Sequence, residues 1–404
     1  MYAYAEELDA WLAANHPATG ANGLQSAPLT LDTSPPSSPA LSTHELPAPS
    51  ASVRGLPRRG IALAATAVAV AVGLAGWRAW RTPVSDAELT AALEPTAIVV
   101  RDAANRQRWE HRFDGQRVEP PQERQRHPVE RLAGGRSGFI GATGLHVSLS
   151  NETVSSGRLM VFTLDGKLTE AFSFGDRVQF QDGAYGAPWG ITDFRVAAHG
   201  DRPVVVAAHH YAWWPSLVTV LDGQWRRSGT FVHAGWLERT HWQAPDRLVV
   251  AGYSEPFDGG VVALLDAAAL GGQTPVPTGS PYFCTSCGPG RPVRYVVMAR
   301  SEVNRASRSR FNRARLEVHA DRIVARTLEA ASSESDVAEA VYEFTPELDL
   351  VRASYSDRYW ARHRALELEG VLDHPPERCP DRDGPRMVSV WEPRAGWRTV
   401  VPRR

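Results

Sequence analysis

Four histidines and seven large aromatic residues are concentrated between positions 209 and 242, and they include the first candidates for a binding site. Imidazole rings bind metals or transfer protons, and aromatic rings commonly line ligand pockets. The residues that we expect adjacent strands to gather into one aromatic ligand pocket are His209, His210, Tyr211, Trp214, Trp236 and Trp242. The alternative is that they are packing residues at the edges of sheets.

The three cysteines form the second candidate constellation. Cys284 and Cys287 make a C-x-x-C motif in a loop rich in glycine and proline, and Cys379 is the remaining thiol. A zinc site built on this motif needs two further ligands, and the chain has no second C-x-x-C. We expect a structural disulfide, either within the loop or from one of its cysteines to Cys379. A metal site completed by a histidine is the alternative, but we predict no metal and no cofactor.

Motifs for catalysis and for nucleic-acid binding are missing from the sequence. It contains no glycine-rich phosphate loop, no H-E-x-x-H and no G-x-S-x-G, so we predict no catalytic residue. The chain carries 44 basic and 45 acidic residues, a balance that argues against a general polyanion binder. The arginines between Arg300 and Arg315 are interpreted as a solvated face.

The elements that would position these residues are β-strands. From Thr96 to Pro402 the hydrophobic pattern alternates with a period of two, as in Ala97–Arg101, and Asp-Gly turn signals such as Asp165-Gly166 separate the runs. The β domain is assigned to residues 84–404. The domain is too long for one sandwich, and at roughly 40–45 residues per blade it predicts a β-propeller of six or seven blades. The terminal strands, 97–113 and 387–400, are expected to share one blade and close the ring.

Hairpins in this domain repeat one phrase, a strand followed by an acidic turn and a second strand with aromatic residues. The repeats are at 100–113, 161–172, 218–225 and 341–350. They resemble blades of quinoprotein-like and integrin-type propellers, as does the strand pair at 191–216. In those families aspartates hold calcium, but here Val204 stands where an acid would be. Calcium requires six or more oxygen ligands, so we predict no calcium site.

Residues 59–80 are predicted to form a single transmembrane helix. The run from 61 to 77 has no charged residue, and about 20 apolar residues span a bilayer. Three arginines precede the run and two follow it, which favours a cytoplasmic N-terminus and an extracytoplasmic β domain. Before it, residues 17–58 are rich in proline and serine and are predicted to be a disordered linker.

Residues 1–16 are predicted to form a short helix, with Leu8, Trp11 and Leu12 on one face. The run from Tyr2 to Leu12 resembles the end of excisionase-type winged-helix DNA-binding domains. The helix-turn-helix of that family is absent, so we expect no nucleic-acid binding through the residues present. The hypothesis is that a DNA-binding head is encoded upstream of Met1, or that the segment is a gene remnant.

Together these features predict a membrane-anchored, non-enzymatic receptor or scaffold in the inner membrane of a bacterium. Its propeller-like domain would bind an unknown ligand or protein, and in its complete form the protein would be a transmembrane transcriptional regulator. Small residues in the span would also permit self-association. The alternatives are a propeller-based enzyme, either a hydrolase or a quinone-dependent dehydrogenase, and a purely structural envelope protein.

Overall fold

The computed structural model describes residues 89–94, 97–112, 129–131, 138–143, 157–199, 202–211, 214–243, 245–308, 312–333, 336–385 and 387–402. The helix, linker and membrane span predicted for residues 1–16, 17–58 and 59–80 lie outside these residues. Within the described ranges, no helix has both the length and the apolar character needed to cross a membrane.

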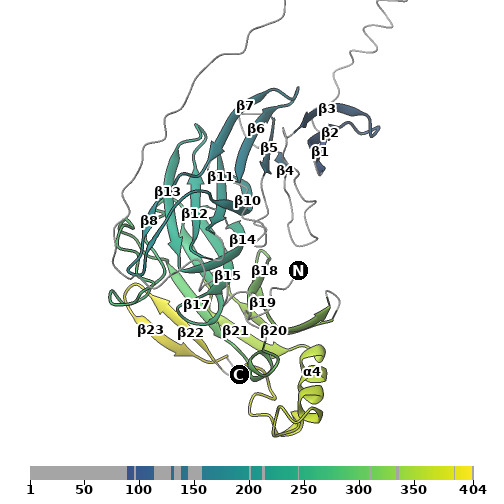
Figure 1. Ribbon diagram of the computed structural model, residues 1–404, viewed down its shortest axis with the longest axis vertical. Coiled ribbons are helices and arrows are strands. Elements are labelled where there is room, and N and C mark those ends of the chain that lie inside the picture. The colour runs from purple at the N-terminus through teal and green to yellow at the C-terminus, as the bar shows by residue number, and fades with distance from the viewer. Residues whose placement is uncertain are drawn as a thin grey trace, which may run out of the picture. The chain divides into compact units, whose positions relative to one another are not determined.

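The described part of the chain is mainly β, which confirms the predicted class. Its strands form antiparallel sheets of which five have three or more strands, and we name these sheets A to E (Figure 1). Sheet A contains β1 (Thr90–Glu94), β2 (Ala97–Arg101) and β3 (Gln107–Arg112). Sheet B contains β4 (Val129–Arg131), β5 (Gly138–Thr143), β6 (Arg158–Thr163) and β7 (Leu168–Ser173). Sheet C contains β10 (Gly190–His199), β11 (Arg202–His210), β12 (Ser216–Leu221) and β13 (Arg227–His233).

The remaining strands build the C-terminal part. Sheet D contains β14 (Gly235–Gln243), β15 (Arg247–Ser254), β16 (Gly259–Asp266), β17 (Arg294–Ala299), β22 (Val388–Glu392) and β23 (Gly396–Val400). Sheet E contains β18 (Ala314–Val318), β19 (Ile323–Ser333), β20 (Asp336–Phe344) and β21 (Leu350–Tyr355). A short sixth sheet pairs β8 (Val178–Gln179) with β9 (Ala184–Tyr185). The helical elements are α3 (Glu302–Ala306), α4 (Asp357–Leu368) and a 3₁₀ turn, η2 (Pro376–Arg378).

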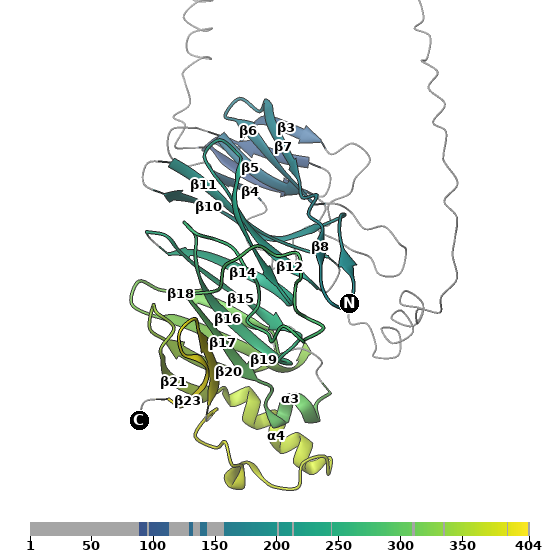
Figure 2. The same cartoon turned by 90° about the vertical axis from the view of Figure 1, so that its left-hand side faces the viewer.

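Successive sheets contact one another through their first strands. Strand β1 contacts β4, β4 contacts β10, β10 contacts β14, and β14 contacts β18. Sheets C, D and E follow one another along the molecule (Figure 2). One hydrophobic cluster lies between sheets C and D, and another lies between sheets D and E. Among the described residues the sheets do not close into a propeller ring or a barrel, so the predicted count of six or seven blades is not seen.

The repeated sequence phrase is confirmed as a repeated hairpin turn. In four sheets a turn begins at an Asp or Thr whose side-chain oxygen accepts the backbone N–H four residues later, at Asp102, Thr163, Asp222 and Thr345. The residue three positions after each of these has a positive φ: Asn105, Gly166, Trp225 and Leu348. Each turn has the same pair of backbone hydrogen bonds. Four sheets therefore share one local design, which the sequence repeat encodes.

The two terminal hairpins do not share a blade, so the predicted ring closure is wrong for the strands described. Strand β22 pairs with β17, and β23 pairs with β22, which extends sheet D to six strands. Strands β2 and β3 instead pair with each other and with β1 in sheet A. Because β22 carries the buried residues Val388 and Val390, its pattern fits the core beside β17.

We expect Gly166→Ala to destabilise the domain by about 1–3 kcal/mol. Gly166 has a φ of +89°, and an added Cβ would lie 2.6 Å from Cγ of Trp109. Trp109 also donates a hydrogen bond from Nε1 to the Leu164 carbonyl at 2.8 Å, so its displacement would break a contact between sheets A and B. Urea unfolding measures the loss. Gly183→Ala is the matched control because its Cβ would meet nothing within 4 Å, and equal stability of both variants would contradict the prediction.

Candidate metal centre

The predicted aromatic pocket is divided by a sheet. His209 and His210 are neighbours on β11, so their side chains point to opposite faces. His209 is fully buried and stacks on Phe174, with ring centroids 3.8 Å apart. His210 instead packs against Trp236 at 4.1 Å. Burial lowers the pKa of His209 well below its usual value, so the ring is neutral at physiological pH.

Tyr211 and Trp214 lie in the same aromatic group as His209, because His209 and Tyr211 both contact Trp189, with ring centroids 5.5 and 6.1 Å away. Tyr211 and Trp214 contact the ring of Tyr185 with centroids 5.5 and 4.9 Å away. Trp242 packs on the cluster between sheets C and D. The six residues are therefore not gathered around one cavity, and ligand binding by them stays a prediction.

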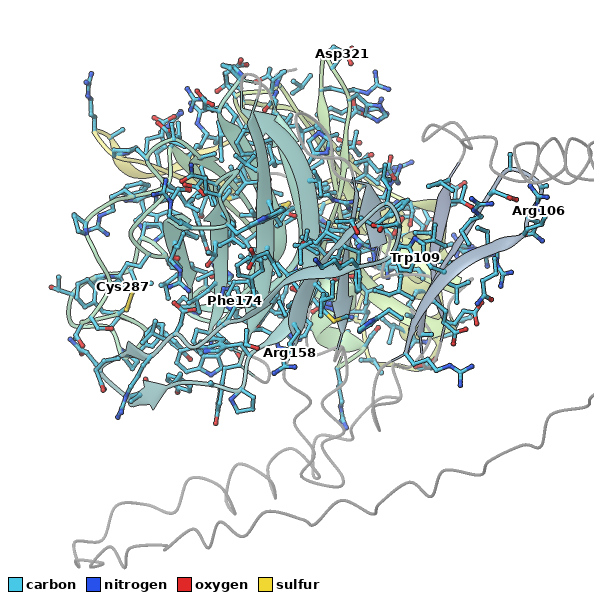
Figure 3. The ribbon with its side chains drawn as sticks, turned by 90° about the horizontal axis from the view of Figure 1, so that it is seen from above. Arg106, Trp109, Arg158, Phe174, Cys287 and Asp321 are labelled. Carbon is cyan, nitrogen blue, oxygen red and sulfur yellow. A yellow bond between two sulfur atoms is a disulfide. The ribbon has the colours of Figure 1, made fainter. Side chains whose placement is uncertain are left out.

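The cysteines divide into a disulfide and a free thiol. Cys284 and Cys287 are bonded to each other in the loop that joins β16 to β17 (Figure 3). Cys379 is free and buried, with 5% of its surface exposed. The pairing within the loop is thus the one present, and Cys379 is available for another role.

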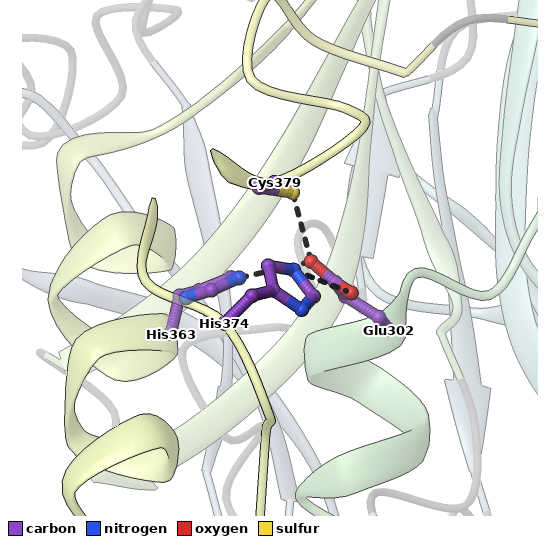
Figure 4. Close-up of side chains that lie close together, drawn as sticks. All are labelled: Glu302, His363, His374 and Cys379. Carbon is purple, nitrogen blue, oxygen red and sulfur yellow. Dashed lines mark hydrogen bonds and ion pairs between the residues drawn. The ribbon is translucent and has the colours of Figure 1, made fainter. Parts of the chain in front are cut away.

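Cys379 lies in a cluster of four potential metal ligands with Glu302, His363 and His374 (Figure 4). One ligand atom from each residue lies within 4.8 Å of all the others. Glu302 is the first residue of α3, and His363 lies on the inward face of α4. His374 lies in the loop after α4, and Cys379 follows η2. Three separate segments thus bring their donor atoms to one point.

The carboxylate of Glu302 contacts each of the other three side chains. Its Oε1 lies 2.9 Å from Nε2 of His363 and accepts a hydrogen bond from the Cys379 thiol at 2.8 Å. Its Oε2 lies 3.4 Å from Nε2 of His374. His363 is completely buried, whereas Glu302 and His374 are partly accessible at 23% and 21% side-chain exposure. The cluster is therefore compact and lies at the boundary between core and solvent.

A carboxylate outside the cluster orients His374. Nδ1 of His374 lies 2.8 Å from Oδ1 of Asp373, which directs Nε2 toward the cluster. This Nε2 is buried and makes no hydrogen bond of good geometry among the described residues, although Oε2 of Glu302 lies 3.4 Å away. Histidines that bind metals usually donate their second nitrogen to a carboxylate or a carbonyl. The arrangement around His374 has that form.

The segment that carries Glu302 is fixed by a buried polar network. Ser301 caps α3 by accepting the N–H of Asn304, and Asn304 donates to the carbonyls of Leu328 and Glu329 on β19. The buried Glu329 carboxyl accepts the N–H of Ser301 at 3.2 Å. Burial raises the pKa of Glu329, so its neutral form is favoured there. These contacts hold Glu302 in place although α3 has only five residues.

The donor set indicates which ion the cluster fits. Two imidazole nitrogens, one sulfur and one carboxylate oxygen make the mixed set that suits tetrahedral Zn²⁺. Calcium and magnesium prefer oxygen ligands alone. Burial and the adjacent Glu302 carboxylate raise the pKa of Cys379 to about 12 in the metal-free protein, so its thiol is a poor nucleophile. The geometry supports metal binding better than cysteine-based catalysis.

This cluster was not predicted from the sequence, because its ligands lie away from the C-x-x-C motif that suggested a zinc site. A signal was present, since His363, His374 and Cys379 fall within 17 residues. Glu302 could not be found from the sequence, because it lies 77 positions before Cys379 and only the fold brings the two together.

Comparisons with known proteins add no function. No family model matches the chain, and no curated protein matches it. Among solved structures, the chain is similar to a protein of unknown function from Bacteroides caccae. The two share 10% identity over 66% of this chain and 93% of that chain, with a TM-score of 0.27. A similarity at this level carries no argument about fold or activity.

Proposed function

We propose that this chain binds one Zn²⁺ ion through Glu302, His363, His374 and Cys379, and that the ion has a structural role. The proposal rests on one observation: four donor atoms of the kinds that zinc binds come together from three segments, and Asp373 orients His374. Zinc sites with four protein ligands are closed and stabilise folds, whereas catalytic sites keep one position open. A structural ion fits a domain that serves as a binding scaffold.

In this proposal the β domain is the platform of a membrane-anchored, non-enzymatic receptor or scaffold. Its sheets form propeller-like blades, and two observations support that proposal. Successive sheets contact one another through their first strands, and four of them share the same hairpin turn. The membrane anchor, the cytoplasmic N-terminus, self-association and the upstream DNA-binding head are further parts of the proposal that rest on the sequence.

Metal analysis of the purified domain tests the zinc proposal. We expect about one zinc per chain after dialysis against trace zinc, and a sulfur-to-cobalt charge-transfer absorption after replacement with Co²⁺. That absorption requires a thiolate ligand, so it reports on Cys379 directly. Protein that binds no zinc, or that binds cobalt without this absorption, would refute the proposed ligand set.

Asp373→Ala provides a second test at the edge of the site. Loss of an outer-shell partner typically weakens metal affinity about 10–100-fold, so we expect a decrease of that size in a chelator competition. Asp321→Ala is the control, because it removes an exposed aspartate that lies outside the cluster. Unchanged zinc affinity in Asp373→Ala would show that Asp373 does not support the centre.

One observation favours a second candidate, a zinc-dependent hydrolase. The Glu302 carboxylate contacts all three other donors, a position that also suits a general base beside a three-ligand zinc. Glu302→Gln separates the two functions. A structural centre loses zinc affinity in this variant, whereas a catalytic centre keeps its zinc and loses hydrolysis.

Protease accessibility in spheroplasts tests the receptor proposal. Cleavage of the β domain from outside is expected if that domain is extracytoplasmic, with a cytoplasmic protein as the protected control. Protection of the domain would overturn a receptor for external ligands. Translation of the DNA upstream of Met1 tests the regulator part, which fails if no helix-turn-helix is encoded there in frame.

A further inference from the structure

The candidate centre joins the two places where the chain leaves sheet D and returns to it. Glu302 follows β17, the last strand before the chain enters sheet E. The other three ligands follow β21, the last strand of sheet E, and precede β22, which pairs with β17. All four strands of sheet E therefore lie between the first ligand and the other three.

The returning hairpin, β22 and β23, pairs with the rest of sheet D over only a short stretch of backbone. Only three register pairs connect β17 to β22, whereas eight connect β15 to β16 in the same sheet. Val388 and Val390 are buried against sheets D and E, and Glu392 forms an ion pair with Arg294 of β17. Trp397 of β23 adds a hydrogen bond to the Pro275 carbonyl at 3.2 Å, so the hairpin covers the edge of β17 through few backbone pairs and a limited set of side-chain contacts that opening would break.

The segment before this hairpin carries two of the ligands. It runs from the end of α4 at Leu368 to the start of β22 at Val388, and its regular structure is the single turn η2. Leu368 and Val371 are 83% and 52% exposed, so part of the segment has little packing. An ion bound to His374 and Cys379 would fix this segment to α3 and α4.

We propose that metal binding at this centre locks the β22–β23 hairpin onto β17, and that metal loss raises the fraction of molecules in which this edge of sheet D is open. The inference rests on the proposed zinc binding. With the ion, the free connection to β22 starts at Cys379, nine residues before Val388. Without it, the segment is held by weaker contacts such as the Cys379–Glu302 hydrogen bond, and where these break the connection starts at Leu368, 20 residues before Val388. The loop-closure term alone predicts roughly a 3-fold increase in opening.

Hydrogen exchange with mass spectrometry tests the lock on the full chain. Zinc-loaded and chelator-treated protein are compared, after metal analysis of both and circular dichroism to confirm that the fold persists. We expect amides in peptides covering 294–299 and 388–392 to exchange at least about 3-fold faster without metal. Peptides from β15 should be unchanged at exchange times too short for global unfolding to contribute, because β16 and β17 separate β15 from β22 in the sheet.

Glu392→Ala is the matched variant that shows whether the readout reports docking. It removes the carboxylate through which β22 pairs with Arg294, which keeps its ion pair with Asp349, and it does not touch the centre. Exchange at β17 and β22 should therefore rise even in zinc-loaded protein. Zinc binding with no change in exchange at β17 and β22 on metal removal would overturn the lock and leave the zinc proposal intact. A failure to bind zinc would overturn both.

Discussion

Cys379→Ser and His363→Ala are each expected to abolish tight zinc binding and the stability that zinc confers. Removal of a ligand should cost more than the ~10–100-fold in affinity that loss of an outer-shell partner costs. A ligand that binds only the folded state stabilises it by ~4 kcal/mol at a free concentration about 1,000 times Kd. We therefore expect added zinc to raise the unfolding free energy of the wild-type domain by about that amount, and to leave both variants unaffected.

Thermal or urea unfolding with and without zinc measures this difference. The matched control is the double variant Cys284→Ser with Cys287→Ser, which removes two sulfurs far along the sequence from the centre. It should keep the zinc-dependent stabilisation in full. If the Cys379→Ser protein is stabilised by zinc as strongly as the wild type, Cys379 is not a ligand.

The domain should lose stability as the pH falls from about 6.5 to 4, and His233 should account for a large part of the loss. His233 is fully buried, with Nε2 2.9 Å from the Tyr253 carbonyl and Nδ1 3.2 Å from the Thr274 hydroxyl. Burial lowers its pKa from 6.5 to about 4. The unfolded chain therefore takes up a proton before the folded one does, and stability present above pH 6.5 is lost as the pH falls.

One group of this kind changes the unfolding free energy by up to ~1.4 kcal/mol per pH unit within that window. In His233→Gln the neutral amide does not titrate, so the variant should be less stable at pH 7.5 but show a smaller decrease toward pH 4. Urea unfolding at a series of pH values measures both effects. The exposed His319→Gln is the control and should follow the wild type. An unchanged pH dependence in His233→Gln would refute the assignment.

Part of the fold could be predicted from local sequence. The period-two pattern placed β2 at Ala97–Arg101 with its observed bounds. The repeated phrase identified hairpins that share one turn, because an Asp or Thr side chain accepts a backbone N–H four residues later. Both signals come from neighbouring residues, so no knowledge of the sheet arrangement was needed to find them.

The predicted pocket depends on side-chain directions that the sheet determines and that closeness in sequence does not record. His209 and His210 are adjacent in sequence, but the pleat sends one toward Phe174 and the other toward Trp236. Because these residues are close in sequence, one site was predicted. In the structure the sheet lies between their side chains, which pack in different groups.

By itself, the sequence determined the mainly β class, the repeated turns and the C-x-x-C loop, because alternation and turn chemistry act over a few residues. Only the tertiary structure decided that β22 returns to β17 and that Glu302 meets His363, His374 and Cys379. These contacts join segments on either side of sheet E. Their partners are chosen by the packing of whole sheets, and no short-range pattern records that choice.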